Sequence, residues 1–294
     1  MTLAGKADRT IDTYVGWVRR LAAHYGISPD RLSEQQLLDF LLILHRKDRA
    51  FSTINQAVNA FRYFYGKILH RPPARLQECL PRPASAKILP RAYSLVQTEQ
   101  LLDAARQKHI LHYTFLSCLY HTGLRLNEGC LLRFNEVERT SHRLLVKAGK
   151  GNKDRYTLLP DCLVEDLDYY YSTYRKHRPA TEPWMFVGRN LPGKPLVDGT
   201  AQNFFYRVYR ARERAGLPDI GGIHVLRHSF ASHQLAAGMS LQRLRAVLGH
   251  KNLTTTLRYL HLVADAEPLT YDPRVSPLAR LHDGTAKRAQ TRES

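Results

Sequence analysis

Basic and aromatic side chains that can act on a phosphate group gather near the C-terminal end of this chain. The cluster comprises His224, Arg227, His228, His250 and Tyr259. Arginine and imidazole groups at one place supply positive charge, planar hydrogen-bond donors and a proton relay, which together suit a phosphate site. A tyrosine hydroxyl beside such a site is a candidate nucleophile. The pattern therefore favours chemistry on a phosphate.

Two helices are expected to position this cluster. Apolar residues recur near helical spacing on both sides of Gly238, which predicts two helices that share a core face. Gly238 suits the C-terminus of the first helix, and Ser240 suits the N-cap of the second. His224 and Arg227, three residues apart, then lie on one helix face.

Two readings without phosphoryl transfer also fit part of this segment. A helix, a glycine turn, a serine cap and a second helix resemble a helix-turn-helix, which would use Arg243 on DNA and leave His250 and Tyr259 without a role. His224 and His228, four residues apart, could bind zinc, but no nearby carboxylate or cysteine completes a third ligand. We therefore expect a site without metal.

The whole pattern resembles a known family. The order His-x-Leu-Arg-His, Leu-Gly-His and then Tyr259 is similar to the C-terminal signature of the tyrosine recombinases, the integrase and Xer-type family. The segment TGLRLNE around Arg125 resembles the TGLRxxE motif of that family. The resemblance implies site-specific DNA recombination by strand cleavage and rejoining through a 3′-phosphotyrosine intermediate. It also implies that no metal, cofactor or ATP takes part, because the covalent link conserves the phosphodiester.

The resemblance also implies a role for each residue of the catalytic set. Tyr259 attacks the scissile phosphate. Arg125 and Arg227 bind its nonbridging oxygens, where charge builds up in the transition state. His224 serves as acid or base near the nucleophile, and His250 hydrogen-bonds the phosphate.

Arg125 and the catalytic lysine belong to an earlier part of the chain. The sequence predicts that Arg125 lies at the N-terminal end of a helix, held there by Glu128. Two β-type runs then flank the segment GKGNKD, which is typical of a hairpin. By the resemblance, Lys150 in this hairpin protonates the leaving 5′-oxygen, and Lys153 is the alternative.

Composition points to a polyanionic partner. The 294-residue chain has 44 Lys and Arg against 26 Asp and Glu, a net charge of +18. The resemblance identifies this partner as double-stranded DNA with inverted core sites, bound by a homotetramer or heterotetramer. Four widely spaced cysteines and no apolar signal or membrane segment predict a cytoplasmic, nucleoid-associated protein.

The chain is expected to be mainly α with a small β-hairpin or sheet. Residues 1–80 form a helical core-type DNA-binding domain, 81–92 a proline-rich linker, 93–270 the catalytic domain, and 271–294 a partly disordered tail. The opening TIDTYVGWVRRL resembles the core-binding domain of the recombinases. The catalytic domain is expected to enclose a buried central helix over 110–121.

Local signals refine these expectations. Ser33 and Ser52 are expected to be N-caps of two helices in the first domain. A basic amphipathic helix over 200–215 is expected to lie along DNA. The predicted DNA-binding residues are Arg207, Arg210, Lys153 and Arg243.

Other functions are less well supported. Gly188 to Lys194 looks like a P-loop, but Pro195 replaces the magnesium-binding Ser or Thr, which excludes an NTPase of that class. A catalytically silent DNA-binding protein with the same fold is opposed by the complete catalytic set. A type IB topoisomerase shares the chemistry but lacks this compact C-terminal signature.

DNA binding should weaken steeply with salt, because each neutralised phosphate releases counterions. With on the order of ten phosphate contacts, affinity should fall roughly 10³–10⁵-fold between about 50 and 200 mM salt. Fluorescence anisotropy on a labelled duplex measures this slope, and a nearly flat dependence would contradict an electrostatic interface.

Overall fold

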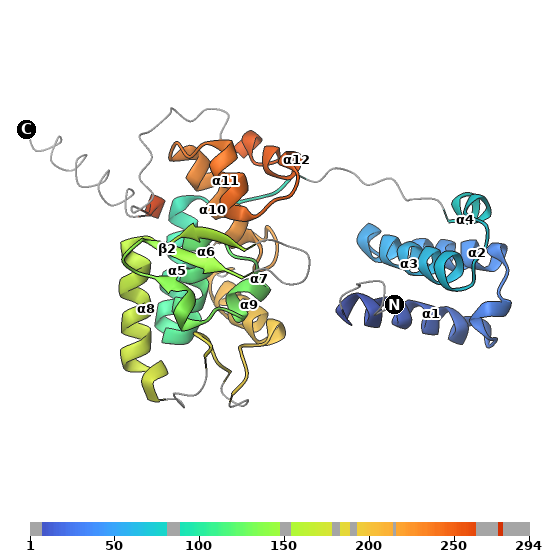
Figure 1. Cartoon of the computed structure of the whole chain (residues 1–294), viewed down its shortest axis with the longest axis horizontal. Helices are drawn as coiled ribbons and strands as arrows, with labels where there is room; N and C mark the ends of the chain where they lie inside the picture. The colour runs from blue at the N-terminus through green and yellow to red at the C-terminus, as the bar shows by residue number, and fades with distance from the viewer. Residues whose placement is uncertain are drawn as a thin grey trace, which may run out of the picture. The chain divides into compact units, whose positions relative to one another are not determined.

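The computed structural model describes most of the chain, in seven stretches. These are residues 8–80, 89–147, 154–177, 183–188, 193–213, 216–262 and 276–278. The chain divides into two compact units, residues 1–88 and 89–294, each with its own hydrophobic core. Helices dominate both units and a small antiparallel sheet accompanies them in the second, so the predicted fold class is confirmed (Figure 1).

The first unit is a small helical domain. Its helices are α1 (Asp8–Tyr25), α2 (Glu34–Arg46), α3 (Phe51–Tyr63) and α4 (Pro73–Cys79). Ser33 caps α2 as expected. Its hydroxyl accepts the backbone N–H of Gln36 at 3.3 Å, and the side-chain oxygen of Gln36 accepts the backbone N–H of Ser33 at 2.9 Å. The expected cap at Ser52 is wrong, since α3 begins two residues earlier than that cap implies and Ala50 occupies the N-cap position without a side-chain bond.

The second unit is built around one buried helix. Its helices are α5 (Leu95–Lys108), α6 (Ile110–Thr122), α7 (Leu126–Cys130), α8 (Asp161–Thr173), α9 (Asp198–Glu213), α10 (Val225–Ala236), α11 (Leu241–Leu248) and α12 (Leu253–Leu257). Eleven of the 13 residues of α6 are buried, and α5, α8, α9 and α10 all pack against it. The predicted central helix is therefore confirmed, because a helix apolar on every side is stable only inside a core.

A three-stranded antiparallel sheet lies beside this helical core. Its strands are β1 (Val137–Glu138), β2 (Arg143–Val146) and β3 (Arg155–Leu158), with β2 in the middle and Leu144 opposite Thr157. The predicted β-type runs form β2 and β3, whereas β1 was not predicted. The hairpin tip, with Lys150 and Lys153, lies outside the described residues.

The first residues of the second unit are hydrogen-bonded to its later part at Pro90 and at Tyr93. His261 Nε2 lies 3.2 Å from the carbonyl oxygen of Pro90. Tyr93 donates its N–H to Ser229 Oγ at 2.9 Å, and its carbonyl accepts from His233 Nε2 at 2.9 Å. Ser229 and His233 belong to α10, so this segment is held by the helix that also carries Arg227. Within the described stretches no helix has the length and apolarity that crossing a membrane requires.

Candidate active site

Arg125 is held where α6 turns into α7. Gly123 ends α6 in the left-handed conformation, with φ of 63°, and Arg125 is the N-cap of α7. Glu128 accepts the backbone N–H of Arg125 at 2.8 Å and its Nη1 at 2.8 Å. The predicted partnership of Arg125 with Glu128 is confirmed. It fixes both the backbone and the side chain of the arginine.

Glu128 has a second arginine partner, Arg155, which sequence reasoning missed. Arg155 Nη1 and Nη2 bind the two carboxylate oxygens at 2.9 and 2.7 Å, and Arg155 Nε donates to the carbonyl of Val247 at 2.8 Å. One signal was available: in β3, Arg155 alternates with exposed Tyr156 and shares a face with buried Thr157. Arg155 therefore connects the hairpin to α7 and to α11.

The arginines keep Glu128 ionised. Burial by itself raises the pKa of this carboxyl, but the hydrogen bonds and charge of Arg155, followed by those of Arg125, lower it to about 2. Glu128 Oε2 also lies 4.0 Å from Nη1 of Arg227. One anionic group thus faces three guanidinium groups.

Arg227 is buried on α10, with 6% of its surface exposed. Its Nη1 donates to the carbonyl of Gly123, and its Nη2 donates to the carbonyl of Leu248 at 2.6 Å. Burial, with the charge of Arg125, lowers the pKa of Arg227 to about 10. The group therefore stays charged at neutral pH, in an orientation that helix ends determine.

His250 lies against Arg227 directly after α11. Gly249 ends that helix in the left-handed conformation, with φ of 65°, and His250 Nε2 lies 3.2 Å from Arg227 Nη2. Because arginine can only donate, Nε2 accepts and Nδ1 carries the proton. Nδ1 then donates to Thr256 Oγ1 at 2.9 Å. Burial, with the charges of Arg227 and Arg125, lowers the pKa of His250 to about 4, so the ring is neutral.

Tyr259 follows α12, and its side chain lies against His228 and His250. Only 3% of its surface is exposed. Its hydroxyl lies 2.9 Å from His228 Nδ1, and its ring stacks on His250 with planes 9° apart and centroids 6.4 Å apart. Burial raises the pKa of Tyr259, while Arg227, Arg258 and Arg125 oppose that rise. The structure thus brings together Arg125, Arg227, His250 and Tyr259 of the predicted set.

The other predicted site residues lie at the edge of this cluster, elsewhere in the second unit or outside the described part. His224 is the exposed N-cap residue of α10, and no hydrogen bond to Tyr259 is found among the described residues. Arg207 and Arg210 are exposed on α9 and line a hollow with Lys108 and His112. Arg243 is exposed on α11.

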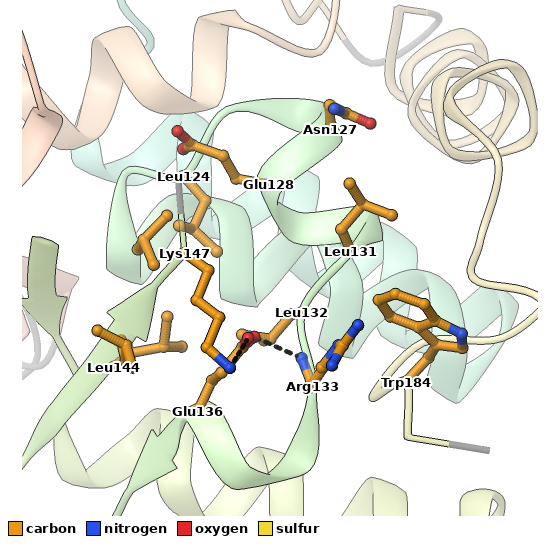
Figure 2. Close-up of a pocket in the computed structure, with 12 residues that line it drawn as sticks. Leu124, Asn127, Glu128, Leu131, Leu132, Arg133, Glu136, Leu144, Lys147 and Trp184 are labelled. Carbon is orange, nitrogen blue, oxygen red and sulfur yellow. Dashed lines mark hydrogen bonds and ion pairs between the residues drawn. The ribbon is translucent and has the colours of Figure 1, made fainter. Parts of the chain in front are cut away.

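A second hollow, of about 340 Å³, lies at the foot of the hairpin (Figure 2). There Lys147 at the end of β2 points away from Glu128 and toward Glu136, whose Oε1 lies 3.7 Å from its Nζ. Glu136 also accepts the backbone N–H of Arg133 at 2.8 Å. Lys147 thus pairs with Glu136 and points away from the cluster. Lys150 and Lys153 remain the candidates for the catalytic lysine. Among the residues with described positions, no group of three His, Cys, Asp or Glu could hold a metal ion.

Comparisons with known proteins identify the family of the chain. Residues 94–265 match the model of the phage integrase family, and residues 1–74 match the phage integrase N-terminal SAM-like domain. A Sinorhizobium fredii protein named as an integrase/recombinase is 30% identical, over 90% of this chain and 84% of the relative. Tyrosine recombinase XerA of Pyrococcus furiosus is 29% identical, over 90% of this chain and 87% of the relative.

Solved structures share the fold. The integrase of transposon Tn1549 bound to transposon right-end DNA aligns with a TM-score of 0.68 at 19% identity, over 89% of this chain and 91% of that one. XerH recombinase in a post-cleavage complex with a difH substrate aligns with a TM-score of 0.65 at 22% identity, over 80% of this chain and 70% of that one.

The chain therefore belongs to the phage integrase family. It is a tyrosine recombinase, an enzyme that recombines DNA at specific sites by cleaving and rejoining strands.

Glu128→Gln should destabilise the second unit in a pH-dependent way. The folded-state pKa of Glu128 is lowered from 4.5 to about 2, so its ionised form stabilises the fold fully above its ordinary pKa. That contribution, about 3 kcal/mol, is lost as pH falls from 4.5 toward 2. The difference between wild type and variant should therefore be large at neutral pH and shrink in acid.

Hydrogen exchange of the α6 amides measures this difference, because that helix opens only when the unit unfolds. Glu213→Gln, at an exposed carboxylate on α9, is the matched control and should change little. An equal loss at pH 7 and near pH 2.5 would contradict stabilisation by the ionised carboxylate.

Proposed function

We propose that this enzyme cleaves DNA at inverted core sites by attack of Tyr259 on the scissile phosphate. The observation that carries the proposal is the placement of buried Tyr259, whose hydroxyl bonds His228 and whose ring stacks on His250, within the electrostatic influence of Arg227. In the reaction, a bond forms between Tyr259 Oη and phosphorus while the bond from phosphorus to the 5′-oxygen breaks. A 3′-phosphotyrosine and a free 5′-hydroxyl result, and the reverse step on another strand completes the exchange.

Two arginines would bind the phosphate together. Arg227 Nη2 is bonded to the carbonyl of Leu248 at 2.6 Å, and Arg125 Nη2 lies 3.4 Å from the carbonyl of Gly249. The two guanidinium groups therefore lie beside the carbonyl groups of consecutive residues. The charge of Arg125 contributes to the lowered pKa of Arg227. A phosphate anion placed on both groups would relieve this repulsion and favour the negative transition state.

The remaining roles follow the family pattern. Lys150, or Lys153 in its place, would protonate the leaving 5′-oxygen. The acid or base near the nucleophile, His224 by the family pattern, would be a histidine from the start of α10. His250, whose Nε2 accepts from Arg227, would support the phosphate through that arginine. Because two arginines provide the charge that a metal ion provides in other phosphoryl-transfer enzymes, the reaction is proposed to need neither metal nor ATP.

Recombination joins four DNA strands, so we propose that four protomers, identical or of two kinds, assemble on paired sites. Arg207, Arg210, Lys153 and Arg243 are the proposed DNA contacts. Complexes of XerH with a palindromic difH substrate and of a lambda integrase dimer with a core site support symmetric binding. The reaction is proposed to take place on the nucleoid, in the cytoplasm.

Tyr259→Phe should abolish covalent attachment and leave DNA affinity nearly unchanged, because the ring still packs while the attacking oxygen is gone. The probe is a pool of nicked duplexes with a randomised core, from which the wild type recovers its own site as a denaturation-resistant adduct. Tyr156→Phe, at an exposed tyrosine of the sheet, is the control. An adduct with Tyr259→Phe would assign the nucleophile elsewhere, and no adduct with the wild type would favour a silent DNA-binding protein.

Arg227→Lys should slow single-turnover cleavage of the recovered duplex by roughly 10²–10³-fold, because a point charge cannot replace a planar fork on two phosphate oxygens. Arg139→Lys is the control, since Arg139 is an exposed arginine outside the cluster whose Nε and Nη2 both bind Asp168 Oδ1. Wild-type cleavage should persist in excess EDTA. Loss of activity in EDTA that magnesium restores would refute the metal-free mechanism.

A further inference from the structure

His228 is the one hydrogen-bond partner of the Tyr259 hydroxyl among the residues that the structure describes. Its Nδ1 lies 2.9 Å from the phenol oxygen, and the two rings lie 5.7 Å apart at 46°. His228 comes from the first turns of α10, whereas Tyr259 follows α12. The family pattern assigns His228 no catalytic role, yet it contacts the atom that would react.

The other two histidines of the cluster are not placed to receive the phenol proton. His250 uses both ring nitrogens, since Nε2 accepts from Arg227 and Nδ1 donates to Thr256. His224 is exposed, and the described residues show no hydrogen bond between it and Tyr259. His228 is therefore the histidine whose free lone pair faces the phenol.

The surroundings of His228 keep its imidazole neutral. Burial lowers its pKa to about 4, helped by the positive charges of Arg227 and Arg258 and by His224 in its charged form. His250, which also interacts electrostatically with His228, is neutral as well. Between a neutral imidazole and a phenol, the phenol is the stronger acid, so the hydroxyl of Tyr259 donates to Nδ1. This is the arrangement that precedes proton transfer.

We infer that His228 is the general base that takes the phenol proton of Tyr259 during strand cleavage and returns it during rejoining. The inference rests on the proposed function of Tyr259. As the bond between Oη and phosphorus forms, the proton moves from Oη to Nδ1, and the 5′-oxygen takes a separate proton from the lysine. The bound phosphodiester adds a negative charge near the imidazole and thereby raises its affinity for the proton.

His228→Asn separates proton transfer from positioning, because Asn Oδ1 can take the place of Nδ1 as an acceptor but cannot hold a proton at neutral pH. On the duplex recovered with the wild type, adduct formation should slow by roughly 10²–10⁴-fold while DNA affinity is nearly unchanged. The variant's rate should then rise about tenfold per pH unit from about pH 7 to 9, as hydroxide replaces the base, while the wild-type rate stays nearly level.

A sulfur leaving group shows whether His228 activates the nucleophile or protonates the leaving group. A duplex with sulfur in place of the bridging 5′-oxygen needs no proton on its leaving group, because a thiolate is a far weaker base than an alkoxide. His228→Asn should remain slow on this duplex, since activation of the nucleophile is still required. Rescue by sulfur would place His228 at the leaving group and overturn the inference.

Two further results would also overturn it: a wild-type rate for His228→Asn, or a slow rate with a level pH profile. His45→Asn, at an exposed histidine of α2, is the control, and its pH profile should stay level like that of the wild type. Failure of the proposed function looks different, since the wild type then forms no adduct or Tyr259→Phe forms one.

Discussion

The site depends on one partly buried carboxylate that balances three guanidinium groups. Without an anion, Arg125, Arg155 and Arg227 would repel one another in a partly buried space where water screens poorly. Glu128 binds the first two through short hydrogen bonds and lies 4.0 Å from the third. These side chains come from α7 and its N-cap, β3 and α10. This group of ion pairs thus links segments that are far apart in the sequence.

Much of this arrangement could be predicted because it is encoded locally. The end of α6 at Gly123, the cap of α11 at Ser240 and the pairing of Arg125 with Glu128 each involve residues within a few positions of one another. Ser52 shows the limit of such signals, because α3 begins two residues earlier than a cap at Ser52 would place it. The packing of the helix against its neighbours outweighs the cap, which contributes only about 1 kcal/mol.

The contacts that complete the site carried weaker signals in the sequence. Arg227 is oriented by the carbonyls of Gly123 and Leu248, and every residue has a carbonyl, so no side-chain motif marks them. Arg155 lies 27 positions from its carboxylate partner. The bond between His228 and Tyr259 spans 31 positions. The spacing pattern predicted which residues would gather, but their pairing required the fold.

The hydrogen bonds that hold Pro90 and Tyr93 involve residues beside the site. Ser229, which holds the N–H of Tyr93, is the next residue after His228. His261, which holds the carbonyl of Pro90, comes two residues after Tyr259. The residues around Pro90 and Tyr93 are therefore anchored on the two backbone stretches that carry His228 and Tyr259. A displacement of either anchor would therefore change the distance between His228 Nδ1 and Tyr259 Oη, which is 2.9 Å here.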